Sequence, residues 1–413
     1  ELRKNIKDTT ESKVMIEKCG TPPLVSLEGM EKILATAQKG DCLTALQLEN
    51  VERTFVAFRR LKEYLNRGKQ LELSLAYEEE KIELLEDIRQ MIALQIRNGA
   101  VDDHATKVLF NVRNDIEKTE NKMKEKADSI MRANKEFLSD SFRTLRNGRV
   151  CIPVKKEYKQ KIDGSVLDQS STGNTLFIEP RAIAKFYDEL QILRIEEENE
   201  LFRILYTLTD LVANSASLIE QNIKTIEKLD FIFSKGKLSI DMGAVEPAIN
   251  TDRIIEIDEG RHPLMDKEIC VPIQFHIGGK NKGVVITGPN TGGKTIAIKT
   301  VALNNLMAQC GLHVTCKRAN LCMNSNYLCD IGDGQNLLEN LSTFSAHIKT
   351  VMTILNEIKS ESLVIMDELG SGTDPTEGMG IAIAILEELK KSECLYLVTT
   401  HYPEVKQYAE EKV

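Results

Sequence analysis

The strongest chemical pattern in the sequence is a glycine-rich run placed between an apolar stretch and a helix-like stretch. The apolar stretch is Val284-Val285-Ile286, and the run itself reads Gly288, Pro289, Asn290, Thr291, Gly292, Gly293, Lys294 and Thr295. It fits the G-x-x-x-x-G-K-[ST] phosphate loop, in which backbone N–H groups and a helix N-terminus face phosphate oxygens. We expect Lys294 to reach the β- and γ-phosphates of a nucleotide and the Thr295 hydroxyl to bind Mg²⁺.

Two acids end a second apolar run, Leu363-Val364-Ile365-Met366. Asp367 is placed to hold the Mg²⁺, in the Walker-B role. Glu368 is placed to polarise the attacking water as a general base. A strand that ends in solvated acids would look the same locally, but the phosphate loop upstream favours the catalytic interpretation.

Two further residues are weaker candidates. His401 follows the apolar run Leu395 to Val398, where it could hydrogen-bond the γ-phosphate or be an ordinary polar strand end. Ser342 precedes the apolar-periodic stretch from Phe344 to Leu355, so it could be a helix N-cap and nothing else. It could also belong to a helix N-terminus presented to a nucleotide bound by another subunit.

These residues must be positioned by a large chain. It has 413 residues, which suggests two or three domains, and 42% hydrophobic residues, which is enough for a large core. No apolar run approaches 18 residues, so a membrane-spanning helix is not expected. The net charge of −9 excludes nucleic-acid binding by bulk charge and leaves a local basic patch as the only means. Nine scattered cysteines without paired C-x2-C spacing indicate reduced thiols and disfavour a zinc site.

The sequence divides into two regions that differ in composition and in apolar pattern. Residues 1 to about 235 are mostly helix-like, with one amphipathic helix expected over 112–137 and a second long helical stretch over 181–235. Between them, residues 147–180 carry turn signals and alternating apolar residues, which predict a small β-unit. From about residue 252, short β-branched runs alternate with helical stretches, which is typical of an α/β fold with a mainly parallel sheet.

The order of these motifs resembles the MutS family of ABC-type ATPases, and most closely its MutS-two branch. The resemblance rests on GPNTGGKT, ENLSTFSAH, LVIMDELGSGTDPTEG and VTTHYPEV, on the GRHPL segment at 260–264, and on NGRVCIPV and GNTLFIEP upstream. It implies a multidomain protein with a mainly helical core and lever region that carries a small β-unit, followed by an α/β P-loop ATPase domain. The expected ranges are 1–145 for the helical core and lever, 146–250 for the β-unit and its long helices, and 251–413 for the ATPase domain.

The resemblance also implies roles. ATP and Mg²⁺ are the expected ligands, and a head-to-tail homodimer would share the ATP sites. Ser342 matches the serine that reaches the γ-phosphate across this dimer, and His401 matches the switch histidine. Gly372 and Thr373 match the dimer-interface loop, and Ile269 lies nearest to the position that packs on adenine.

Three functions remain open. The first is an ATP-driven clamp, in the bacterial cytoplasm, that acts on branched DNA in recombination suppression or on stalled and collided ribosomes through rRNA. The second is a mismatch-binding repair ATPase, which the absence of a Phe-x-Glu wedge domain disfavours. The segment Phe177-Ile178-Glu179 matches the Phe-x-Glu pattern but is expected to pack inside the β-unit. The third is a structural ATPase with helical arms. Because the chain begins at Glu1 and stops twelve residues after His401, we expect a fragment, to which nuclease activity cannot be assigned.

Overall fold

The computed structural model describes residues 1–289, 292–331 and 343–412. These residues form two compact units, each assembled from separate segments of the chain. The first unit comprises Glu1–Pro22, Tyr64–Glu79 and Ile226–Val413, and the second comprises Pro23–Glu63 and Glu80–Thr225. The protein is therefore a mixed helix-and-sheet molecule, which is compatible with the expected multidomain architecture.

The centre of the first unit is a parallel sheet. Its strands lie in the order β10 (Gly283–Thr287), β14 (Leu395–Thr400), β13 (Leu363–Met366) and β12 (Tyr327–Asp330), and every neighbouring pair is parallel. All residues of β13 and β14 are buried, as expected for parallel strands covered on both faces. Because the sheet is parallel, the segments that follow its four strands all begin at one edge.

The two faces of this sheet have separate cores, since successive side chains of a strand point to opposite faces. Leu363 and Ile365 pack with α8 (Lys294–Gln309), whereas Val364 and Met366 pack with α9 (Thr343–Glu357), α10 (Pro375–Lys391) and α11 (Pro403–Lys412). The first core also includes a second, mixed sheet. Its strands are β7 (Ala248–Asn250), β11 (Arg318–Cys322), β8 (Ile255–Gly260) and β9 (Ile273–Ile277), in that order.

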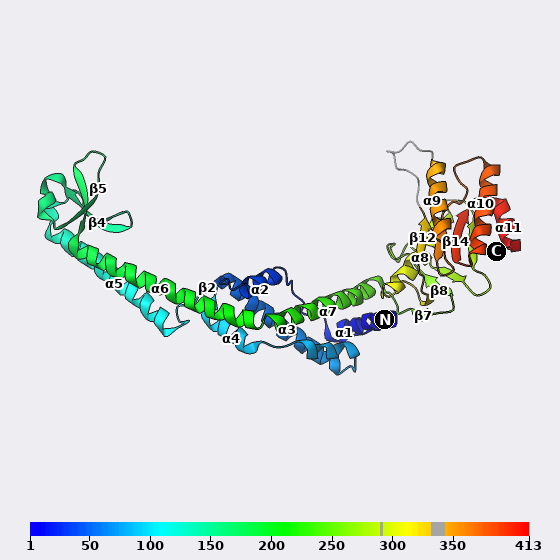
Figure 1. Ribbon diagram of the computed structural model, residues 1–413, viewed down its shortest axis with the longest axis horizontal. Helices are drawn as coiled ribbons and strands as arrows, with labels where there is room; N and C mark the ends of the chain where they lie inside the picture. The colour runs from blue at the N-terminus through cyan, green and yellow to red at the C-terminus, as the bar shows by residue number, and fades with distance from the viewer. Residues whose placement is uncertain (290–291, 332–342, 413) are drawn as a thin grey trace. The chain divides into compact units, whose positions relative to one another are not determined.

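Helices complete the first unit. They are α1 (Leu2–Cys19), the end of α3 (Ala45–Lys69), most of the 3-10 helix η1 (Ser74–Lys81), and the part of α7 (Ala216–Met242) that starts at Ile226. α1 lies beside α7 (Figure 1), where the Ser12 hydroxyl donates to the Ile232 carbonyl at 3.1 Å. A Cβ on Gly236 would lie 2.2 Å from the Ser12 Oγ, so this glycine permits the close approach of the two helices.

The second unit has a helical part and a β-bearing part. The helical part includes α2 (Met30–Gln38), α3 as far as Glu63, α4 (Glu86–Gln95) and the short strands β1 (Ile96–Arg97) and β2 (Ala100–Val101). From it extend α5 (Lys107–Ala133) and α6 (Arg181–Asn214), which run side by side (Figure 1). Between them in sequence lies a four-stranded antiparallel sheet. Its order is β3 (Thr144–Arg146), β4 (Arg149–Lys155), β6 (Thr175–Pro180) and β5 (Gly164–Gln169), and the 3-10 helices η2 (Lys135–Phe137) and η3 (Lys156–Lys161) flank its strands in sequence.

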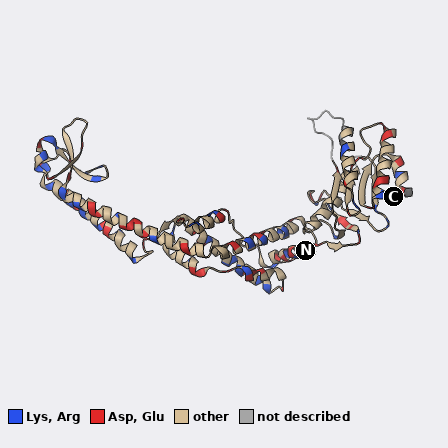
Figure 2. Cartoon of the chain, viewed as in Figure 1, with Lys and Arg blue, Asp and Glu red and all other residues tan. Residues whose placement is uncertain are grey.

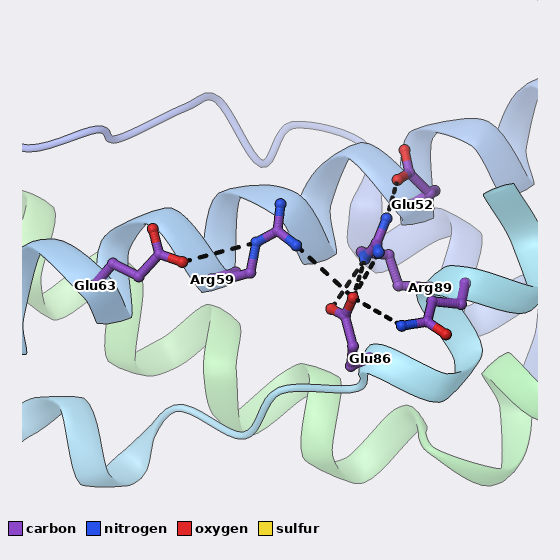
Figure 3. A network of polar contacts seen from close by, with 6 residues as sticks. Glu52, Arg59, Glu63, Glu86 and Arg89 are labelled. Atoms are coloured by element: carbon purple, nitrogen blue, oxygen red, sulfur yellow. Dashed lines mark hydrogen bonds and ion pairs between the residues drawn. The ribbon is translucent and has the colours of Figure 1, made fainter.

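An ion-pair network ties α3 to the start of α4 in the second unit (Figure 3). The Arg89 guanidinium donates to Glu86 at 2.5 and 2.9 Å and to Glu52 at 3.2 Å, and Arg59 joins Glu86 to Glu63 with contacts of 3.7 and 3.9 Å. The hydrogen bonds from Arg89 lower the pKa of Glu86 to about 2. Glu86 therefore stays ionised at the first turn of α4, where negative charge also complements the helix dipole.

The long helices differ in two details from the sequence prediction. The apolar repeat over 112–137 predicted one helix, but α5 ends at Ala133 and Phe137 lies in a separate 3-10 turn. The side-chain amide of Asn134 donates to the Ile130 carbonyl at 2.8 Å, and such local bonds favour helix ends. The stretch over 181–235 is likewise two helices, because α6 ends at Asn214 and α7 begins at Ala216.

The β-unit agrees with the sequence prediction. Ile178 and Glu179 are 1% and 2% exposed, so the Phe177-Ile178-Glu179 segment packs within the antiparallel sheet. All nine cysteines are free thiols. No described helix combines the length and the apolar character that crossing a bilayer would require.

Candidate active site

The glycine-rich loop connects the end of β10 to the first turn of α8. Gly288 has φ +148° and Gly293 has φ +78°, and at both positions an L side chain would be strained. The Gly292 N–H donates to the Pro289 carbonyl at 3.0 Å, which tightens the loop. Within the described residues no side chain caps α8, so its first N–H groups can receive an anion. Asn290 and Thr291 lie outside the described residues.

Lys294 is folded back over this loop. Its side chain is only 5% exposed, and its ammonium donates to the Gly288 carbonyl at 2.6 Å. The cation is thus held at the mouth of the loop where a phosphate would lie. Its position at the start of α8 adds its charge to the positive end of the helix dipole.

Thr295 and Asp367 lie in contact, although 72 positions separate them. The Thr295 Oγ1 donates to the Asp367 Oδ2 at 2.6 Å, and so it joins the start of α8 to the end of β13. A hydroxyl and a carboxylate are hard oxygen ligands of the kind that Mg²⁺ prefers. The donor set that the sequence predicted for the metal is therefore brought together by the fold and fits the ion.

Glu368 is held in a left-handed backbone conformation with φ +49°. For a non-glycine residue this conformation costs roughly 1–3 kcal/mol. Its N–H donates to the Thr399 Oγ1 at 2.8 Å, and the next residue's N–H donates to the Thr399 carbonyl at 2.8 Å. The turn that orients Glu368 is thus fastened to the neighbouring strand, β14.

Thr399 is a site residue that the sequence analysis did not single out. It is fully buried, and its hydroxyl donates to the Asp367 Oδ1 while accepting from the Glu368 N–H. One side chain therefore holds both acids. The only sequence signal was the pair Thr399-Thr400 at the end of an apolar run.

Asp330 and His347 also lie near the acid strand. The Asp330 carbonyl accepts from the Asp367 N–H at 2.9 Å, and its carboxylate contacts the His347 Nδ1 at 3.1 Å. Asp330 ends β12, next to β13 in the sheet. Neither residue was predicted for the site. The short strand β12, which ends at Asp330, was not predicted, and His347 appeared only as the last residue of the motif ENLSTFSAH.

The remaining predicted residues are less tightly placed. His401 follows β14 with an exposed side chain, and its ring lies 4.3 Å from the Tyr402 ring. The Thr373 hydroxyl donates to Glu377 at 3.3 Å near the start of α10. Ile269 is 72% exposed. Ser342 lies outside the described residues.

Comparison with known proteins places the chain in a family. The family model MutS domain V matches residues 284–413, which contain all four strands of the parallel sheet except the first residue of β10. A protein named Endonuclease MutS2 from Clostridium botulinum (strain Eklund 17B / Type B) is 39% identical over 99% of this chain. The chain belongs to the MutS2 branch of the MutS family.

Other relatives in this branch match the chain with similar identity and coverage. Proteins with the same name from Alkaliphilus oremlandii and from Geobacillus sp. (strain WCH70) are 38% and 39% identical over 98% and 97% of the chain. The chain spans about half the length of these relatives, since the matches cover 52–53% of them. The resemblance drawn from the motifs is confirmed at the level of the family and its branch.

Proposed function

We propose that this chain is a MutS2-type ATPase that binds ATP with Mg²⁺ and hydrolyses it to ADP and phosphate. The observation that carries the proposal is the contact between Thr295 and Asp367, because it joins the phosphate loop to the acid-bearing strand. An arrangement of loop, hydroxyl and carboxylate at one sheet edge suits a nucleoside triphosphate and its metal ion. We assign ATP hydrolysis, and not nuclease chemistry, to these residues.

The roles in hydrolysis follow from the positions. Lys294 and the N–H groups of α8 would bind the phosphates, and Thr295 and Asp367 would hold the Mg²⁺, which neutralises charge on the phosphate oxygens. Glu368 would accept the proton of the attacking water. The family resemblance, and not the geometry, adds two further roles. His401 would contact the γ-phosphate from the end of β14, and Ser342 would reach it from the partner subunit of a homodimer.

We further propose that the protein acts on nucleic acid, either as branched DNA or as rRNA in stalled ribosomes in the bacterial cytoplasm. Residues 122–161 carry twelve Lys and Arg against five Asp and Glu, a net charge of +7 within a chain of −9. This basic segment covers the end of α5, strands β3 and β4, and η3 (Figure 2). It supplies the local patch that an acidic protein needs to bind phosphate backbones.

The nucleotide proposal is tested by the change Lys294→Ala. Losing a buried ammonium that faces the phosphates should weaken binding of a fluorescent ATP analogue by about tenfold or more. Lys280→Ala, which removes an exposed lysine of the same unit, is the control and should leave binding unchanged. Equal affinities of the wild type and Lys294→Ala, with both proteins folded by circular dichroism, would remove Lys294 from the phosphate site.

The two nucleic-acid substrates are separated by two binding measurements on the same protein. Co-sedimentation with ribosomes in a sucrose gradient tests the first, and mobility shift with a four-way DNA junction tests the second. Each is done with ATP and with the Glu368→Gln variant, which should hold ATP without turning it over. Binding to neither substrate would contradict the nucleic-acid part of the proposal and leave the ATPase part standing.

A further inference from the structure

A cavity lies within the second unit, where the turn between β3 and β4 faces the paired helices α5 and α6. Its volume is about 460 Å³, which falls in the range of about 300–1,000 Å³ typical of small-ligand sites. α5 provides Glu120, Met123 and Lys124, and α6 provides Tyr187, Leu190, Gln191 and Arg194. The rest of the lining comes from Arg143, Thr144, Leu145, Gly148 and Val150.

The inner wall of the cavity is apolar with a few polar groups. Met123, Val150 and Leu190 are buried, and they form a surface on which a flat ring could pack. The Thr144 Oγ1 is buried with no hydrogen-bond partner among the described residues, so a ligand could satisfy it. The Gln191 amide adds one more donor and acceptor among the lining residues.

Tyr187, the aromatic residue of the lining, contacts a side chain that does not itself line the cavity. The Arg149 guanidinium lies 4.1 Å from the centre of the Tyr187 ring, and Arg149 is itself paired with the buried Glu179 at 2.7 Å. Tyr187 is therefore fixed by the β-unit. A fixed aromatic side chain costs little conformational entropy when a second ring packs against it.

The lining also carries an excess of positive charge. Lys124, Arg143 and Arg194 face only Glu120 among the lining residues. The two guanidinium groups make ion pairs that a ligand could compete with: Arg194 with Glu120 at 3.2 Å and Arg143 with Asp128 at 2.5 Å, with side chains 56% and 38% exposed. Since exposed pairs of this kind are weak, phosphate oxygens could replace the carboxylates as partners.

We propose that this cavity accepts a single nucleotide, with its base on the apolar wall and its phosphate on Arg143 and Arg194. The inference rests on the proposed action on nucleic acid, since seven of the twelve lining residues belong to the basic segment 122–161 that would hold the backbone. A base inside a duplex is stacked and paired and cannot enter, whereas an unpaired one can. The cavity would thus select nucleic acids that contain unpaired residues, which branched DNA and rRNA both do.

A free nucleotide offers the same base and phosphate as an unpaired residue of a nucleic acid, so the test uses two probes on the full chain. The first is 2-aminopurine placed as one unpaired residue in a duplex of otherwise paired bases, made as DNA and as RNA. The second is 2-aminopurine riboside monophosphate alone. Fluorescence and competition against the fully paired duplex measure the preference for the unpaired base.

The variants place a charge inside or outside the cavity. Leu145→Glu puts a carboxylate in the wall at a residue that is already 66% exposed, so folding should tolerate it. Val166→Glu makes the same charge change at a 39% exposed residue of β5, at the opposite edge of the same sheet and away from the cavity. Because Leu145 lies inside the basic segment and Val166 does not, each variant's own affinity for the paired duplex is the reference for its preference.

The wild type should bind the duplex with the unpaired residue at least about fivefold more tightly than the paired duplex. Leu145→Glu should lose this preference and Val166→Glu should keep it. Saturable binding of the monophosphate that Leu145→Glu abolishes would also support the cavity and identify a free nucleotide as the source. Duplex binding with no preference for the unpaired base, and no binding of the monophosphate, would overturn the cavity proposal and leave the proposed function intact.

Discussion

At the scale of single residues, Thr399 links the two acids of the candidate active site. Its hydroxyl donates to Asp367 and accepts from the Glu368 N–H, and no solvent reaches it. Removing the hydroxyl leaves an Asp367 oxygen and a backbone N–H without these partners, which costs about 1–3 kcal/mol per buried group. We therefore assign Thr399 a positioning role for both the metal ligand and the general base.

The prediction for this residue uses Thr399→Val and Thr399→Ser. Val keeps the shape but not the hydroxyl, so we expect about a tenfold slower turnover and a higher Mg²⁺ concentration for half-maximal nucleotide binding. Ser keeps the hydroxyl and should restore both. A Mg²⁺ titration of fluorescent-nucleotide binding, run beside the turnover assay, checks this; a Val variant with the wild-type Mg²⁺ dependence would refute the role.

The sequence identified some of these residues and not others, for a physical reason. The phosphate loop and Asp367-Glu368 are local patterns, because their chemistry needs adjacent residue types after an apolar strand. Thr399 and Asp330 matter only because β14 and β12 flank β13 in the sheet. Strand order depends on tertiary packing, and a single sequence does not contain it.

At the scale of elements, a buried polar cluster joins the segment that follows α8 to α1 and α7 within the first unit. His313 is 3% exposed; its Nδ1 lies 2.7 Å from the Ser239 Oγ and its Nε2 lies 2.8 Å from the Thr10 Oγ1. The Thr9 hydroxyl donates to the Gly311 carbonyl at 2.7 Å. The segment that leaves the helix of the phosphate loop is therefore hydrogen-bonded to both α1 and α7.

This cluster predicts a pH dependence of stability. Burial, with a smaller effect of the Lys13 charge, lowers the pKa of His313 to about 4 from 6.5. The unfolded chain takes up the proton near pH 6.5 and the folded chain only near pH 4, so His313 makes stability fall between these values by roughly 3 kcal/mol. Above pH 6.5 it contributes no pH dependence.

The measurement is urea denaturation between pH 7.5 and 4.5 for the wild type and His313→Gln. The amide of Gln does not titrate, so the variant should lose less stability than the wild type as the pH falls through this window. Parallel pH profiles for the two proteins would show that His313 is not the group responsible.

At the scale of the whole molecule, charge is distributed unevenly along an acidic chain. The basic segment 122–161 includes Lys156, Lys159 and Lys161, which are exposed on η3. Exposed lysines bind phosphates by releasing counterions, so their effect on affinity depends on salt. The proposed contact with nucleic acid is therefore mainly electrostatic outside the cavity.

The corresponding prediction is a change of salt dependence. Replacing Lys156, Lys159 and Lys161 together by Glu should weaken duplex binding and reduce the slope of log K against log salt by about 2–3. The same triple change at Lys280, Lys349 and Lys359, exposed lysines of the first unit, is the control. If the two triple variants have the same slope, η3 does not contact the backbone.

The division of the chain into compact units was the feature of the fold that the sequence indicated least. The change of apolar pattern near residue 250 correctly predicted that strands and helices alternate beyond it. The turn signals over 147–180 likewise indicated the β-unit. The two compact units, however, interleave, because residues 1–22 and 64–79 pack with residues that start at Ile226. Contacts such as Ser12 with Ile232 join segments 220 positions apart, which periodicity cannot indicate. The ranges 1–145, 146–250 and 251–413 stay a prediction.

The central claim is that the edge where Thr295, Asp367 and Glu368 meet hydrolyses ATP, and the most direct measurement compares binding and turnover in one variant. With Mg²⁺ present, the wild type should bind ATP and release phosphate over many turnovers. Glu368→Gln keeps the shape and the positive-φ backbone but cannot accept a proton, so it should bind ATP with similar affinity and release almost no phosphate. Phosphate release by Glu368→Gln at the wild-type rate, or a wild type that binds no ATP, would contradict the account.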